Sequence, residues 1–169
     1  VYGPGIVRAG PVAVRLPFPE QQHVAGPHRV GVAVEVCRDA WVPDRPAAAM
    51  NRDAVDIIMN PSATHFAFDK LEVRKRLCLE ASRDLDVTYI HSNLLGNEAG
   101  RAIYDGDAMI ASDGEMLSVG PRLTFHDVQL TAAVIDVQRT RTSRERDGSY
   151  QPSLEEEGIV AASFAFPDC

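Results

Sequence analysis

The chain has 169 residues, of which 45% are apolar and 24% are charged, and its formal net charge is −7. This composition is typical of a soluble globular domain, and a chain of this length can bury about two thirds of the surface of its unfolded form. The negative charge argues against non-specific binding to nucleic acid, and no apolar run approaches the ~20 residues that span a bilayer. We therefore expect neither a nucleic-acid nor a membrane partner.

The three cysteines are an odd number without a repeated short spacing, so they predict neither a disulfide framework nor a zinc site. No signal-peptide pattern is present, and the two observations together favour a reducing, cytoplasmic location. The five histidines lack ligand spacing, so no metal site is expected, and no phosphate-loop motif is present, so no other cofactor is expected in this part of the protein. Residues 1–28 are rich in Pro and Gly and match no motif; with Val1 in place of a methionine, we expect an internal piece of a longer protein.

The first half of the chain is predicted to alternate between strands and helices. Apolar and valine-rich runs predict buried strands, and a proline suits the first turn of a helix. In chain order the predicted elements are an alternating segment at 12–16, a strand at 30–36, a helix at 46–52, a strand at 55–60, a helix at 69–84 and a strand at 87–92. In the long helix, the residues predicted to face the core recur at every fourth position. They are Val73, Leu77, Ala81 and Leu85, with Cys78 also in the core and Asp69 as the cap or first-turn carboxylate.

The second half is predicted to contain mostly strands before the chain turns polar. The polar segment 93–106 is expected to be a loop that lines the site or a subunit contact, or whose polar side chains satisfy hydrogen bonds within the loop itself. Residues 107–119 predict two strands joined at Asp113-Gly114, a dipeptide typical of hairpin turns. A strand at 128–137, a solvated tail or linker at 138–158 and a last strand in IVAASFAFP follow. This order predicts a layered α/β fold with a mixed sheet.

Cys37 follows the valine-rich strand directly, in VGVAVEVCRDAW. Open α/β sheets place their active sites at the carboxyl ends of central strands, and a nucleophilic cysteine there needs a nearby cation or base and donors for an oxyanion. The backbone N–H of Arg38 could be one such donor. From the residues alone, a cysteine at a strand end is more often a small buried apolar side chain, so both interpretations stay open.

Three blocks of the sequence resemble the nitrilase (carbon–nitrogen hydrolase) superfamily, and most of all the glutaminase domain of glutamine-dependent NAD synthetases. They are VGVAVEVCRDAWVPDRP, DIIMNPSATHFAFDK and YIHSNLLGNEAGRAIYDGDAMIASDGEML, in the order of the family. The resemblance covers about residues 29–137, and residues 138–169 are then expected to lead towards a synthetase domain outside the chain. It implies a nitrilase-like α-β-β-α sandwich with mixed sheets, of which this chain supplies roughly the second half, in a homo-oligomer.

The resemblance also implies the chemistry. Cys37 would be the nucleophile of a Glu-Lys-Cys triad that releases ammonia from glutamine through a thioester, and the N–H of Arg38 would hold the oxyanion. Positions near the substrate pocket of the family match Trp41, Ser62 and Lys70. Without the resemblance, these three would be a core or rim aromatic, a turn hydroxyl and a solvated cation. ATP and deamido-NAD are implied as ligands of the missing synthetase domain, not of this part.

The other two triad residues lie upstream of the cysteine in the family, and this chain does not match them. The residues before Cys37 include no lysine, and Lys70 and Lys75 are the only lysines of the chain. Glu35 is predicted to be a buried carboxylate paired with a neighbouring donor, and Glu20 to be exposed in a Pro-rich loop. Arg38 stands where the family has a glutamate, which favours a substrate with a carboxylate or a pair with a nearby aspartate.

The sequence therefore predicts part of a glutamine amidohydrolase that is inactive on its own. Two alternatives stay open: an amidase, nitrilase or carbamoylase of the same superfamily acting on another small amide, and a catalytically silent fragment that contributes only an interface.

Overall fold

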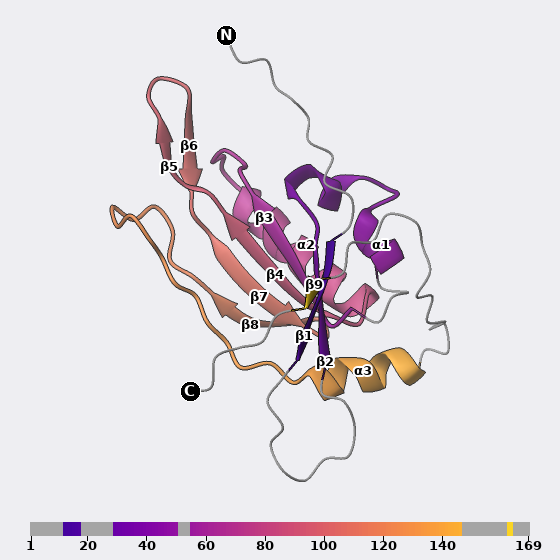
Figure 1. The fold of residues 1–169 in the computed structure, drawn as a ribbon. Helices are drawn as coiled ribbons and strands as arrows, with labels where there is room; N and C mark the ends of the chain where they lie inside the picture. Colours follow the sequence, from indigo (N-terminus) through magenta and orange to yellow (C-terminus); the bar gives the residue numbers. More distant parts are fainter. Residues whose placement is uncertain (1–11, 18–28, 51–54, 147–161, 164–169) are drawn as a thin grey trace.

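A computed structural model describes residues 12–17, 29–50, 55–146 and 162–163 (Figure 1). The strands are β1 (Val12–Pro17), β2 (Arg29–Val34), β3 (Ile57–Ser62), β4 (Thr88–Asn93), β5 (Leu95–Glu98), β6 (Ala102–Asp105), β7 (Ala108–Ser112), β8 (Glu115–Val119) and β9 (Ala162–Ser163). The helices are the short 3₁₀ helix η1 (Cys37–Trp41), α1 (Pro46–Met50), α2 (Lys70–Asp84) and α3 (Val137–Arg146).

Seven of these strands form one mixed sheet in the order β8-β7-β4-β3-β2-β1-β9. The three central strands β2, β3 and β4 are parallel, whereas β1 pairs antiparallel with β2 and β7 pairs antiparallel with β4. Because parallel strands end at the same edge, the segments after β2, β3 and β4 meet at one end of the sheet (Figure 1). The predicted α/β class with a mixed sheet is confirmed.

The main core lies between α2 and one face of this sheet. Side chains alternate across the sheet, so in β3 Ile58 is fully buried while its neighbour Met59 is 42% exposed. Tyr89 of β4 shares the buried face with Ile58, and Cys78 of α2 packs against it, as predicted. On the opposite face Ile57 and Ile90 are only partly covered. The described residues therefore form one main mixed sheet with α2 packed on one of its faces.

The buried face of α2 differs from the prediction. Its buried residues are Arg74, Cys78, Ala81 and Ser82. Val73, predicted to face the core, is 47% exposed. The face is displaced because the Arg74 guanidinium is neutralised by two buried aspartates, so a charged side chain occupies a core position. Asp69 does occupy the N-cap position, but its φ is +66° and its side chain makes no capping hydrogen bond.

The predicted hairpin is confirmed, since Asp113 and Gly114 both have positive φ, at +51° and +75°, between β7 and β8. A two-residue hairpin turn of this kind needs positive φ at both positions. The segment 93–106 is more ordered than a loop, because β5 and β6 pair within it as an antiparallel ribbon. Within the last predicted strand, Ala162–Ser163 form β9, which pairs parallel with β1; the other residues of that prediction lie outside the described residues.

Two predictions for the end of the chain are wrong. Residues 120–136 contain no strand, so the strand predicted at 128–137 is absent, and Val137 instead begins a helix. The stretch predicted as a solvated tail starts with α3, whose Thr140 and Arg144 are buried; the part of that stretch beyond 146 lies outside the described residues. The predicted helix at 46–52 is seen as α1 up to Met50, and Glu20 also lies outside the described residues.

Arginine side chains, not an apolar stripe, hold α3 against the sheet. Arg141 contacts both carboxylate oxygens of Asp56, at 2.8 and 2.7 Å, and Asp56 also accepts a 2.8 Å hydrogen bond from the N–H of Gly31. Arg144 donates to the carbonyl oxygens of Val55 and Asp86. The helix therefore covers the end of the sheet opposite to Cys37 (Figure 1). No helix in the described ranges is long and apolar enough to cross a membrane.

Candidate active site

Cys37 is the first residue of η1, placed where the chain leaves β2 at the carboxyl edge of the sheet. It is a free, half-buried thiol, and its φ of +47° lies in the left-handed region. That conformation costs a non-glycine residue about 1–3 kcal/mol and persists only where the surroundings enforce it. Asp69, Asp86, Asp113 and Leu123 also have positive φ, so the backbone supports Cys37 as the centre of the candidate site only together with its place at the carboxyl edge of the sheet.

The residues before Cys37 are anchored through Glu35. Its buried carboxylate accepts two hydrogen bonds from Arg45, at 3.1 and 2.7 Å, and one from the Tyr89 hydroxyl at 3.0 Å. Burial and the charge of Glu35 raise the pKa of Tyr89, so the phenol stays a donor. Glu35 is thus the paired, buried carboxylate that the sequence predicted. It helps to hold the backbone turn at Cys37 in place.

Asn60 connects this anchor to the next two strands. Its side-chain Nδ2 donates to the carbonyl oxygen of Glu35 at 2.8 Å. Its Oδ1 accepts from the Ser62 hydroxyl at 2.8 Å and contacts His91 Nδ1 at 2.9 Å. Asn60 and His91 are direct register partners in β3 and β4, and both are almost fully buried. Ser62, a predicted site residue, is therefore joined to the Cys37 turn through Asn60.

Behind His91 lies a buried charged cluster centred on Arg74. Its guanidinium pairs with Asp105 and, at 2.9 Å, with Asp107, and Arg122 also reaches Asp105 at 3.1 Å. Burial favours the protonated form of Asp105, but Arg74 and the hydrogen bonds to the carboxylate outweigh it and lower its pKa. Burial raises the pKa of Asp107. Burial and the charge of Arg74 lower the pKa of His91 to about 4, so its imidazole is neutral at neutral pH.

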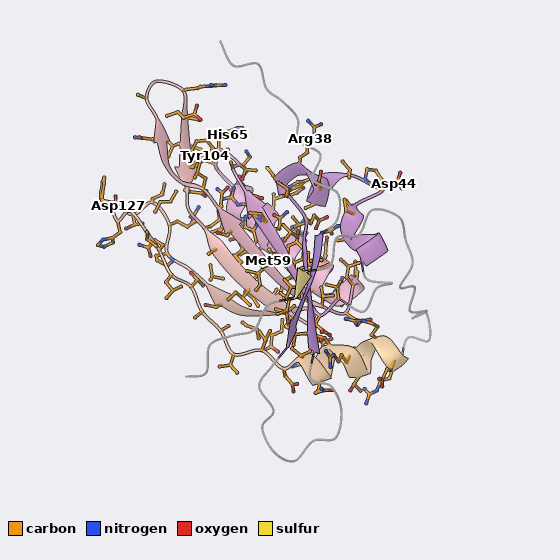
Figure 2. All side chains as sticks on the ribbon, in the orientation of Figure 1. Arg38, Asp44, Met59, His65, Tyr104 and Asp127 are labelled. Atoms are coloured by element: carbon orange, nitrogen blue, oxygen red, sulfur yellow. The ribbon has the colours of Figure 1, made fainter. Side chains whose placement is uncertain are left out.

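The remaining predicted site residues lie around this end of the sheet. Arg38 is exposed on η1, and within the described part of the chain it forms no ion pair, so the predicted pairing with Asp39 or Asp44 is not seen. Trp41 ends η1 and is 45% exposed. Lys70 begins α2, and its Nζ donates to the His65 carbonyl oxygen at 3.0 Å. Figure 2 shows Arg38 and His65 at the same end of the molecule.

An open cleft of about 500 Å³ lies at this end, between His65-Phe66 and the β5–β6 ribbon. Its other lining residues run from Asn97 to Ile103 and include the charged side chains of Glu98 and Arg101. Lys70 borders the cleft only indirectly, through its contact with His65. Among the described residues, no three His, Cys, Asp or Glu side chains gather as metal ligands.

The sequence analysis did not identify Arg45, Asn60 and His91 as residues that hold the backbone before Cys37 in place. A usable signal for the last two was present, because each is a polar residue at a position where strand alternation predicts burial. Arg45 had no such signal, since it lies in an irregular segment between η1 and α1.

No family model matches the chain. The glutamine-dependent NAD(+) synthetase of Saccharomyces cerevisiae is 32% identical over 131 residues, which are 78% of this chain and 17% of that protein. A crystal structure of a glutamine-dependent NAD(+) synthetase from Cytophaga hutchinsonii matches 62% of this chain and 17% of its own, with 35% identity and a TM-score of 0.52.

A carbon–nitrogen hydrolase from Helicobacter pylori extends the comparison of the fold. It matches 68% of this chain and 43% of its own, with a TM-score of 0.56 and 21% identity, so this likeness concerns the fold alone. The chain spans only about a sixth of the length of the curated relatives that it matches. The chain is therefore similar, over about three quarters of its length, to one part of the glutamine-dependent NAD(+) synthetases, and it shares its fold with a carbon–nitrogen hydrolase.

Proposed function

We propose that this chain contributes the nucleophile-bearing part of a glutamine amidohydrolase that supplies ammonia to an NAD synthetase. The observation that carries the proposal is the left-handed conformation of Cys37 at the carboxyl end of β2, held by anchored neighbours. The similarity to glutamine-dependent NAD(+) synthetases supports glutamine as the substrate. In the full protein, the ammonia would convert deamido-NAD to NAD at an ATP-dependent synthetase domain, in a cytoplasmic homo-oligomer.

The proposed reaction has two steps. The Cys37 thiolate attacks the side-chain carboxamide carbon of glutamine, and the C–N bond breaks as ammonia leaves with a proton from a general acid. Water then attacks the thioester, which frees the thiol and leaves glutamate. The backbone N–H of Arg38 is placed one residue after the thiol to hold the oxyanion, and Trp41, Ser62 and Lys70 are the proposed substrate contacts.

The general acid and the cationic oxyanion partner are not assigned to this chain. Glu35 is committed to Arg45 and Tyr89, and Lys70, which donates to the His65 carbonyl oxygen, is proposed only as a substrate contact. We therefore expect the 169-residue chain to release no ammonia from glutamine. The polypeptide translated from the whole reading frame that contains it should release ammonia, and Cys37→Ala should abolish that release.

The nucleophile is tested directly with a glutamine analogue that carries an electrophilic diazoketone. In the longer polypeptide, the reagent should modify Cys37, excess glutamine should slow the reaction, and buried Cys78 should stay unmodified. Equal labelling of both cysteines, or no protection by glutamine, would contradict the proposal.

A second candidate is an amidase or carbamoylase whose substrate carries a carboxylate. It is favoured by the exposed Arg38 guanidinium, which has no ion-pair partner among the described residues and lies beside Cys37. Rates of ammonia release from glutamine, simple amides and N-carbamoyl amino acids separate the two. If the second candidate is right, N-carbamoyl amino acids, which carry a carboxylate, are hydrolysed faster than both glutamine and simple amides, and Arg38→Glu reduces that preference.

A further inference from the structure

The orientation of the Asn60 side chain fixes the tautomer of His91. Asn60 Nδ2 faces the carbonyl oxygen of Glu35, which can only accept, so the amide nitrogen must be on that side. Asn60 Oδ1 is then the atom that faces His91 Nδ1 at 2.9 Å, and Nδ1 must carry the hydrogen. The Nε2 atom is left bare.

The bare Nε2 atom faces the carboxyl group of Asp107. The distance from Nε2 to Asp107 Oδ2 is 3.7 Å, and Nε2 and Asp107 Oδ1 have no hydrogen-bond partner within the described residues. Two lone pairs that face each other in a buried site repel, unless a proton lies on one of the groups. Burial raises the pKa of Asp107, which is the direction that lessens this repulsion.

The contacts that run from Asp107 through His91 and Asn60 end at Glu35, just before the turn that carries Cys37. Glu35 is held at its N–H by the carbonyl oxygen of Met59, at 2.9 Å, and at its own carbonyl oxygen by Asn60. Two residues later the backbone takes the unfavourable φ of +47°. If the Asn60 amide turned over, its oxygen would face the Glu35 carbonyl oxygen and this restraint on the turn would be lost.

We propose that His91, acting through Asn60, is a positioning residue for the turn that carries Cys37. Its Nδ1–H holds the Asn60 amide in the one orientation that donates to Glu35, and the same amide oxygen orients the Ser62 hydroxyl. The importance of this role for catalysis rests on the proposed function, in which Cys37 is the nucleophile. The positional effect on the thiol does not depend on what the substrate is.

The test measures the rate at which iodoacetamide alkylates Cys37 in the 169-residue chain, followed by peptide mass mapping. His91→Met removes the donor at nearly the same volume, and His91→Gln keeps a donor. Asn60→Leu removes the amide, and the double variant Asn60→Leu/His91→Met closes a mutant cycle. Thr88→Val is the matched control, because it removes an equally buried hydrogen bond, to Ser112, from the same strand β4.

We expect His91→Met and Asn60→Leu each to change the alkylation rate of Cys37 by at least threefold, and the double variant to match Asn60→Leu alone. His91→Gln and Thr88→Val should stay within twofold of the unaltered chain. The proposal is overturned if His91→Met leaves the rate unchanged, or if the effects of the two substitutions multiply in the double variant.

Buried Cys78 reports unfolding in the same experiment. If His91→Met exposes Cys78 to the reagent, the comparison moves to His91→Gln against His91→Glu. Only the glutamine side chain donates a hydrogen bond when the carboxylate is ionised, so only His91→Gln should keep the original rate. Iodoacetamide does not require recognition of glutamine, so a failure here is distinct from a failure of the diazoketone labelling.

Discussion

The left-handed backbone of Cys37 gives a prediction about stability that depends only on the turn. At a φ of +47°, alanine bears a conformational cost of about 1–2 kcal/mol that glycine does not bear. Glycine loses more freedom on folding, which costs about 0.5–1 kcal/mol relative to alanine. The difference predicts that Cys37→Gly is more stable than Cys37→Ala by up to about 1.5 kcal/mol, because both variants lose the same thiol.

Position 36 is the matched control. Val36 precedes Cys37 and has an ordinary extended backbone, with φ −93° and ψ 120°. There Val36→Gly should be less stable than Val36→Ala by about 0.5–1 kcal/mol, so the order of the two substitutions reverses between adjacent positions.

Reversible urea unfolding of the four variants, followed by far-UV circular dichroism, measures both differences. A chain of this size shifts its melting temperature by about 2–4 °C for each kcal/mol, so thermal scans serve as a second readout. If alanine is preferred to glycine at position 37 by the same margin as at position 36, the turn is not strained and the reasoning about Cys37 fails.

Two further predictions concern buried positions elsewhere in the fold. Arg74→Met should cost about 3–5 kcal/mol at pH 7, because it leaves two buried carboxylates without their cation. Without Arg74 both carboxyl groups bind protons more readily in the folded than in the unfolded chain, so the deficit should shrink as the pH falls towards 5; a deficit in urea unfolding that is independent of pH would contradict this. Gly106→Ala should cost about 2–4 kcal/mol, because φ is +70° and a Cβ there would lie 2.8 Å from Leu95 Cβ. Gly100→Ala has the same φ in open space and should cost only the conformational part, so equal losses at the two glycines would refute the steric explanation.

Much of the sheet could be predicted because its residues follow simple patterns. The valine-rich run before Cys37, the apolar run at Ile57–Met59 and the Asp113-Gly114 turn each specify their structure locally. The proposal that Cys37 is the centre of the site rests on the order of three motif blocks, and its left-handed backbone is a second, independent argument for it.

Two of the failed predictions, those for α2 and α3, have one physical cause: charged side chains occupy buried positions that local sequence patterns assign to apolar side chains. Arg74 sits in the core because Asp105 and Asp107 neutralise it, and those partners are about 30 residues away in the chain, beyond any local periodicity. The helix α3 likewise lacks an apolar stripe, so its sequence predicts a solvated tail. Only a three-dimensional view shows that Arg141 and Arg144 find buried acceptors.

The strand predicted at 128–137 failed for a different reason. Val128, Leu130 and Val134 alternate with less exposed residues as they would in a strand, but all three are at least 80% exposed and no neighbouring strand hydrogen-bonds to the segment in the described structure. Alternation indicates that a segment is suited to a sheet, and pairing decides whether it joins one.

The carboxylate of Asp56 sets an order of events in folding. It joins Gly31, 25 residues before it, to Arg141, 85 residues after it, while its backbone carbonyl accepts from Thr88. Closing the longer loop first would cost more chain entropy for a single ion pair than closing the shorter ones that build β2, β3 and β4. We therefore expect the pairing of β2, β3 and β4 to assemble the acceptor for Arg141 before α3 docks. During synthesis of the chain, Asp56 can pair with Arg141 only after 85 further residues have been added.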